Sequence, residues 1–146
     1  MKRIALVALL ISAFAAGVFA RGKQPIAFEK VPNVVQEEVQ KYFLPLEIQL
    51  VTVKKVAPRK FVYTFTMEEG SQLKYTNKAV LLEVKNEKAG VTLALVPEKI
   101  QEYVRDIFPN ATITKYEVTP SKKVVELNDE MTLIFTKRDR FVRIED

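Results

Sequence analysis

The sequence predicts an α+β fold made of two tandem repeats, each a helix followed by a four-stranded antiparallel sheet, with the helices on one face of the sheet. Three observations predict this fold. A motif at residues 31–43 recurs at residues 96–108, so that Pro32 and Pro97 lie 65 positions apart. Within each copy, apolar residues recur every four positions and then every two. Each helix has one apolar side and therefore needs one sheet face to cover it.

Each repeat opens with a predicted helix of about three turns. Val35 and Val39 in the first copy, and Ile100 and Val104 in the second, place their side chains on one face of the helix. Prolines are expected in the first turn or just beyond the last: Pro32, Pro97, Pro45 and Pro109. These features set both ends of the two helices.

Four strands are predicted after each helix, because β-branched and aromatic residues alternate there. They are residues 48–56, 61–67, 72–76 and 80–84 in the first copy, and 112–118, 123–127, 131–135 and 140–144 in the second. Short turns join them, which favours antiparallel pairing. A further hairpin between residues 80–84 and 91–95 is predicted to connect the copies.

The first twenty residues are typical of a cleaved signal peptide. Lys2 and Arg3 precede a 16-residue run at 4–19, and the run ends in small residues up to a cleavage site after Ala20. The alternative is a single membrane anchor, but spanning a bilayer takes about 20 apolar residues. We therefore expect a periplasmic or secreted protein with no stable membrane span after cleavage. The predicted domains are a signal peptide (1–20), a first repeat (21–90) and a second repeat (91–146).

The composition excludes several classes of chemistry. The chain has no Cys and no His, which removes thiolate nucleophiles, disulfides, the commonest general base and the commonest metal ligand. Adjacent acidic residues occur mainly at predicted turn tips, where solvated charge is usual. No phosphate-binding glycine loop or nucleophile motif is present. We predict no enzyme, no cofactor, no metal and, for an exported chain with a formal net charge of +5, no nucleic-acid partner.

The sheet face turned away from the helices is the predicted binding surface. The second copy is apolar on both faces at Leu133, Ile134 and Phe135, and strands of that kind are usually covered on both sides. Loops, the other copy or a dimer partner could cover them; the other interpretation is a patch that binds a partner. The predicted partner-binding residues are Lys74, Thr76, Ile134, Thr136 and Arg143.

Residues 96–104, followed by Phe108-Pro109-Asn110-Ala111, resemble the helix-to-strand signature of the PepSY-like family. These are exported bacterial proteins, often duplicated, whose fold is like that of the β-lactamase inhibitor protein. The resemblance covers about residues 26–146. The first copy has Leu44-Pro45-Leu46 where the family pattern has Phe-Pro-x-Ala, and the last strand lacks the glycine turn and terminal tryptophan common in the family.

The resemblance implies a small binding or inhibitory module with no catalytic residues to carry over. Together with the signal peptide, it leads us to expect a non-catalytic protein that binds or modulates another envelope or secreted protein, such as a peptidase, through the open sheet face. Since fold does not fix function, inhibition of a β-lactamase is not implied. The alternative is a periplasmic carrier that holds a small apolar ligand between helices and sheet.

Overall fold

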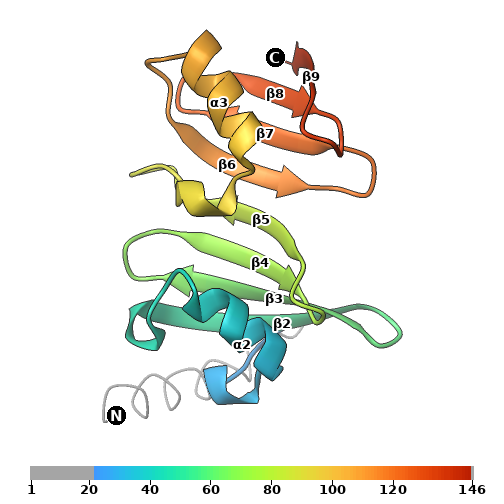
Figure 1. Ribbon diagram of the computed structural model, residues 1–146. Coiled ribbons are helices and arrows are strands. Elements are labelled where there is room, and N and C mark those ends of the chain that lie inside the picture. Colours follow the sequence, from blue (N-terminus) through green and yellow to red (C-terminus); the bar gives the residue numbers. More distant parts are fainter. Residues whose placement is uncertain (1–21, 146) are drawn as a thin grey trace. The chain divides into compact units, whose positions relative to one another are not determined.

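The computed structural model describes residues 22–145 (Figure 1). The predicted signal peptide and its cleavage site at Ala20 lie outside the described residues. The chain divides into two compact units between Leu81 and Leu82. In the part of the chain that the structure describes, each unit has one α-helix and several antiparallel strands, and each unit is described below by itself.

The elements of the first unit follow one another as β1 (Lys23–Pro25), the 3-10 turn η1 (Phe28–Lys30), α2 (Asn33–Gln40), η2 (Pro45–Glu47), β2 (Ile48–Ala57), β3 (Lys60–Met67) and β4 (Gln72–Thr76). The elements of the second are β5 (Leu81–Lys85), η3 (Leu93–Leu95), α3 (Glu98–Ile107), β6 (Ile113–Val118), β7 (Lys123–Leu127), β8 (Thr132–Phe135) and β9 (Phe141–Glu145). Among the described residues, none of the helices is both long enough and apolar enough to cross a membrane.

The predicted fold class is wrong. The nine strands form one antiparallel sheet in chain order, β1 to β9, rather than two helix-plus-four-strand repeats. Two pairings account for the difference. The unpredicted strand β1 pairs with β2, with Gln24 opposite Val53. Strand β5 precedes α3 in the chain but pairs with β6, which follows α3, with Val84 opposite Tyr116. It is therefore continuous with the strands that follow the second helix. The helices are short, with 8 and 10 residues, and the protein is mostly sheet.

The predicted hairpin between residues 80–84 and 91–95 does not form. The side-chain oxygen of Asn86 accepts the backbone N–H groups of Lys88 and Ala89, and Gly90 has a positive φ of 85°, so the chain turns sharply after β5. Only the start of the expected strand touches the sheet: the N–H of Val91 donates to the carbonyl of Ile113. The chain then enters the 3-10 turn η3, which leads into α3 instead of returning along β5.

A repeated glutamine fixes the start of both helices. The Nε2 of Gln36 donates to the carbonyl of Val31 at 2.7 Å, and the Nε2 of Gln101 donates to the carbonyl of Val96 at 2.7 Å. Each bond ties the first turn to the extended residue before the proline. Pro32 and Pro97 themselves have extended ψ angles of 139° and 141° and therefore precede the helices rather than lying within the first turn.

The core of each unit lies between its helix and one face of its strands. In the first unit, Val35 and Val39 of α2 are fully buried, as are Phe65 and Leu73 of the sheet. In the second unit the corresponding layer includes an aromatic group, in which the Tyr103 ring of α3 stacks on Phe141 with ring centroids 4.6 Å apart. Other buried side chains on these sheet faces are Val51, Tyr75, Val84, Tyr116, Val125, Leu127, Leu133 and Phe135.

Candidate binding face

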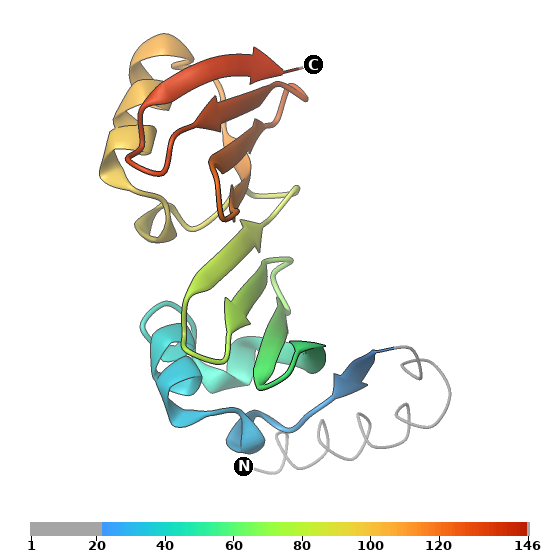
Figure 2. The ribbon, with the colours of Figure 1, turned by 90° about the vertical axis from the view of Figure 1, so that its right-hand side faces the viewer.

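Strand register separates the two faces of the second unit. Tyr103 of α3 makes an edge contact with Phe135 at 5.6 Å, so Phe135 and its same-face neighbours lie toward the helix. Residues of opposite parity point away from α3 and form what we call the open face. Figure 2 shows α3 on one side of β6–β9, with no described helix of this unit on the other side. The open face is therefore defined by the register of five strands.

Two cross-strand rows make up the open face of the second unit. The first row is Glu83, Glu117, Val124, Ile134 and Arg143. The second row is Lys85, Lys115, Glu126, Thr132 and Glu145. Charged residues thus surround two apolar side chains at the centre of the first row. Of these two side chains Val124 is partly exposed, whereas Ile134 is buried.

A lysine joins three strands of this face. The Lys115 Nζ lies 3.3 Å from a carboxylate oxygen of Glu83 on β5 and 3.6 Å from one of Glu126 on β7. Glu83 is only 7% exposed, so its carboxylate depends on this cation for compensation. Burial lowers the pKa of Lys115, but the carboxylates of Glu126 and Glu83 outweigh that effect and hold the pKa above its ordinary value. The lysine is charged at neutral pH.

The five predicted partner-binding residues fall into three groups. Ile134 and Arg143 are direct cross-strand partners on the open face of the second unit. Ile134 is 3% exposed, whereas Arg143 is exposed and donates through Nε and Nη2 to the Glu145 carboxylate at 3.1 and 2.7 Å. Lys74 lies on β4 of the first unit, opposite Thr64 and turned away from the face that buries Phe65.

Thr76 and Thr136 have structural tasks that the sequence analysis did not foresee. The Thr76 hydroxyl accepts the backbone N–H groups of Lys78 and Val80 at 3.2 and 3.1 Å. The Thr136 hydroxyl accepts those of Arg138 and Arg140, both at 3.2 Å. Each threonine therefore fixes the turn that leads into the next strand. Their hydroxyl oxygens are already occupied as acceptors.

A second charged group, missed by the sequence analysis, lies on the helix side of the sheet. The Lys123 Nζ lies 2.6 Å from the Asp139 carboxylate, and both side chains are less than one-fifth exposed. Burial raises the pKa of Tyr116 beside them, although Lys123 opposes the shift. Burial lowers the pKa of Lys123, but the hydrogen bond to Asp139 and the neighbouring Tyr116 outweigh it, so the pKa lies above its ordinary value. This is a fully paired cluster with a structural role.

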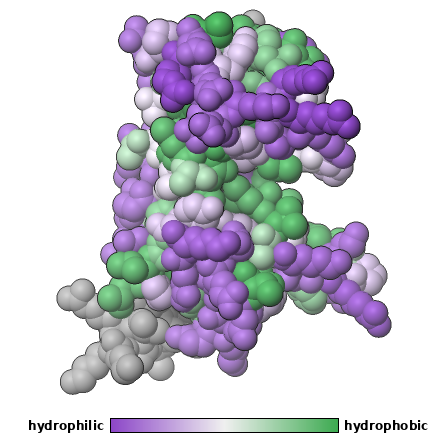
Figure 3. Space-filling model, viewed as in Figure 1, coloured by the Kyte–Doolittle hydropathy of each residue, from purple (hydrophilic) through white to green (hydrophobic). Residues whose placement is uncertain are grey.

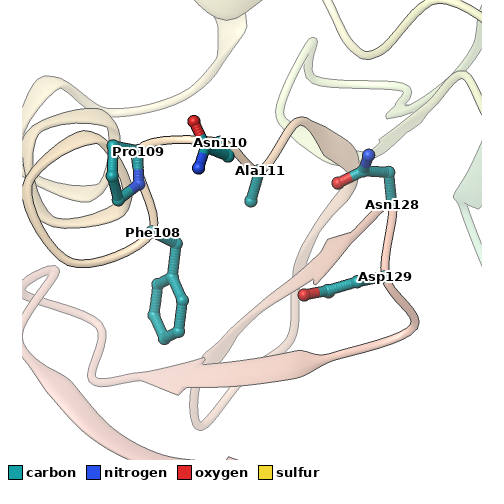
Figure 4. A pocket seen from close by; sticks show the side chains of 6 residues that line it. All are labelled: Phe108, Pro109, Asn110, Ala111, Asn128 and Asp129. Atoms are coloured by element: carbon teal, nitrogen blue, oxygen red, sulfur yellow. The ribbon is translucent and has the colours of Figure 1, made fainter.

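A shallow cavity of about 250 Å³ lies between the end of α3 and the β7–β8 turn (Figure 4). Its lining residues are Phe108, Pro109, Asn110, Ala111, Asn128 and Asp129. The most polar part is engaged locally: the side-chain oxygen of Asn128 accepts the N–H of Thr112 at 2.9 Å, and that of Asp129 accepts the N–H of Met131. Within residues 22–145, no group of three or more acidic side chains is placed to hold a metal ion.

The fold and face described above define a small, predominantly antiparallel β-sheet protein with a helix on one side of the strands of each unit. The chain belongs to the PepSY-like family, described as "Putative beta-lactamase-inhibitor-like, PepSY-like", whose sequence model matches residues 20–83 and again residues 62–143. The predicted family resemblance is therefore confirmed. No curated protein matches the chain.

Solved structures share the fold. A "putative calcium-regulated periplasmic protein" from Bacteroides thetaiotaomicron is 22% identical, with a TM-score of 0.77 over 85% of this chain and 97% of that one. A periplasmic protein of the DUF2874 family from Bacteroides vulgatus is 21% identical, with a TM-score of 0.77 over 87% and 99%. A periplasmic protein of unknown function from the same species is 18% identical, with a TM-score of 0.76 over 86% and 100%.

Proposed function

We propose that this chain is an exported, non-catalytic module that binds another envelope protein, periplasmic or secreted, through the open face of its sheet. The observation that carries the proposal is the row in which Val124 and Ile134 lie between Glu117 and Arg143, on the side of the second unit away from α3. An apolar centre with a charged rim is the usual composition of a protein-binding surface. The periplasmic description of three proteins with this fold supports the exported location.

Different predicted residues make different contributions in this proposal. Arg143 would contact the partner in the second unit, and Lys74 would do so in the first, whereas Ile134, at 3% exposure, would support this contact from below. Because the hydroxyl oxygens of Thr76 and Thr136 accept bonds within their turns, these two residues would shape the surface rather than recognise the partner. The Lys115 ion pairs would hold Glu83 and Glu126 in place at the edge of the row.

The packing gives no support to the alternative of an apolar-ligand carrier. The space between α2 and its sheet is occupied by side chains that are completely inaccessible to solvent, including Val35, Val39, Phe65 and Leu73. A ligand there would have to displace a close-packed layer.

Site-specific photo-crosslinking in cells tests the proposal. A photoreactive amino acid at Val124 samples the open face, and the same amino acid at the exposed Arg105 of α3 serves as the control. In the view of Figure 3, the surface in the region of α3 is largely hydrophilic. We expect a discrete adduct with an envelope protein from position 124 and none from position 105. Identical adducts from both positions, or none from position 124, would contradict the proposal.

A further inference from the structure

The two outermost strands of the sheet differ in how well they are protected. An edge strand presents unpaired N–H and C=O groups, and natural proteins guard such edges with short strands, proline or lysine. Strand β1 has all three features: it is three residues long, starts at Lys23 and ends at Pro25. Strand β9, at the other end of the strand order, is five residues long and has neither proline nor lysine; its charged residues are Arg143 and Glu145, which have opposite signs.

Strand β9 also exposes apolar side chains. Val142 and Ile144 are each 46% exposed, and among the described residues β9 pairs only with β8. The irregularity in the β8–β9 pairing lies near the start of the strand, opposite Ile134 and Phe135, so the segment from Arg143 to Glu145 pairs regularly. A regular, partly apolar edge is suited to accept another strand.

The charges of this segment favour a second copy of this chain as the strand that pairs with β9. Arg143 and Glu145 flank Ile144 symmetrically and have opposite signs. If a second copy pairs antiparallel with Ile144 opposite Ile144, each Arg143 lies directly opposite Glu145 of the second copy. If the pairing is centred on Arg143 instead, two guanidinium groups face each other. Opposite charges in direct cross-strand positions stabilise a sheet and like charges destabilise it.

We propose that two copies of this chain associate through β9, in an antiparallel pair centred on Ile144. The contact is isologous, as in most homodimers, because the same segment serves both copies. Arg143 and Glu145 already pair within one strand at 2.7 Å. In the dimer the two guanidinium and two carboxylate groups alternate around a square on the open face, so that every charge gains a second partner. The two Ile144 side chains meet on the opposite face, the side of Leu133.

A charge-swap experiment tests this pairing. The protein is expressed from the full sequence, including the predicted signal peptide, and purified. Sedimentation velocity is then measured from about 1 μM to about 1 mM, a range in which weak complexes dissociate. The variants R143E and E145R each place like charges opposite one another, and we expect each to raise the dimer Kd about tenfold or more. Their mixture restores both opposite-charge pairs and is expected to form a heterodimer about as tight as wild type. K23E on the protected edge is the matched control.

Cysteine cross-linking tests the register independently. The chain has no cysteine, so a single substitution reports one position. We expect Ile144→Cys to form an oxidised dimer readily, because directly opposite residues bring their Cβ atoms to about 4.5–5.5 Å, close to what a disulfide needs. Val142→Cys, opposite position 146 in this register, is expected to do so much more slowly. Circular dichroism establishes that each variant is folded.

Three results would overturn the proposal. The first is a wild-type monomer at every concentration. The second is a dimer whose Kd is unchanged by R143E and E145R, or whose weakened variants do not recombine, since it would then be held elsewhere. The third is cross-linking through position 142 as fast as through position 144, which would exclude the register centred on Ile144.

Discussion

Among residues 22–145 the buried Tyr75 hydroxyl has no hydrogen-bond partner, so its removal directly tests the packing of the first unit's core. Tyr75 is 1% exposed and packs edge-on against Phe65 with ring centroids 6.3 Å apart. Leaving a buried polar group unsatisfied costs about 1–3 kcal/mol. Tyr75→Phe removes that cost and keeps the ring. We expect the free energy of unfolding to rise by about 1 kcal/mol, equivalent to a melting temperature higher by roughly 4 °C.

The second unit supplies the matched control. With the 60-residue shift between the later strands, the pair Tyr63–Tyr75 corresponds in register to Lys123–Phe135. Phe135→Tyr adds a hydroxyl to a fully buried ring and is expected to lower stability by about 2 kcal/mol or more, through desolvation and overpacking. Urea unfolding measures both variants. A loss of stability in Tyr75→Phe would show that the hydroxyl has a partner and would refute the reasoning.

The same substitution changes the alkaline pH dependence. Burial raises the pKa of Tyr75, with smaller contributions from Glu38 and Tyr42 on the helix side. An unfolded chain ionises its tyrosines near pH 10, whereas the folded chain keeps this phenol protonated. The ionisation of Tyr75 therefore leaves the free energy of unfolding unchanged below about pH 10 and lowers it as the pH rises further. We expect the decline to be shallower in Tyr75→Phe than in the wild-type protein.

Three further predictions concern the second unit, one of them with a matched control. Asp139→Asn keeps the size of the side chain at a residue whose φ is +67°, but it removes the ion pair with Lys123 and should cost about 1–2 kcal/mol in urea unfolding. Because the pKa of Lys123 is raised in the folded chain, the ion pair contributes fully to the free energy of unfolding below about pH 10.5, and this contribution is lost as the pH rises further. Above that pH, Asp139→Asn should therefore lose less stability than the wild-type protein does. Ile100→Ala should cost about 2–5 kcal/mol, whereas Ile107→Ala, at a position 55% exposed, should cost less than about 0.5 kcal/mol. Gln101→Ala removes the hydrogen bonds to two carbonyls before α3. It should lower the free energy of unfolding by about 1 kcal/mol, seen as a lower melting temperature, without changing the sheet.

Local patterns predicted the elements better than their connections. The strands expected at residues 72–76 and 123–127 have the same bounds in the structure. Both helices also lie where their apolar stripes place them. Neither pattern states which strand lies next to which. The pairing of β5 with β6 joins residues separated by the whole of α3, and nothing in the alternation of residues 80–84 distinguishes that partner from a returning hairpin. The β5–β6 pairing, which the sequence pattern does not indicate, is what connects the strands on either side of α3 into one sheet.

The charged groups of the second unit could be predicted only in part. The contact between Lys115 and Glu83 depends on the β5–β6 pairing and was therefore inaccessible. The Lys123–Asp139 pair could have been suspected from the sequence, because the 60-residue shift aligns these two charged residues with the uncharged Tyr63 and Ala79 of the first copy. Ala79 and Asp139 both adopt a positive φ, 64° and 67°, which shows that the two turns share a backbone shape while their side chains differ. A departure between two copies of a motif indicates where their chemistry diverges.

The difference between the two units bears on how the sheet can bind. Matching registers place Thr64 opposite Lys74 in the first unit and Val124 opposite Ile134 in the second. If the proposed binding holds, a polar pair in one unit and an apolar pair in the other would favour different partner surfaces, so a single repeated ligand would fit only one of them. A partner that engages both faces must therefore present two unlike patches, or else it binds one unit alone. Photo-crosslinking from position 74 beside position 124 separates these cases: one shared adduct indicates the first arrangement, and an adduct restricted to one position indicates the second.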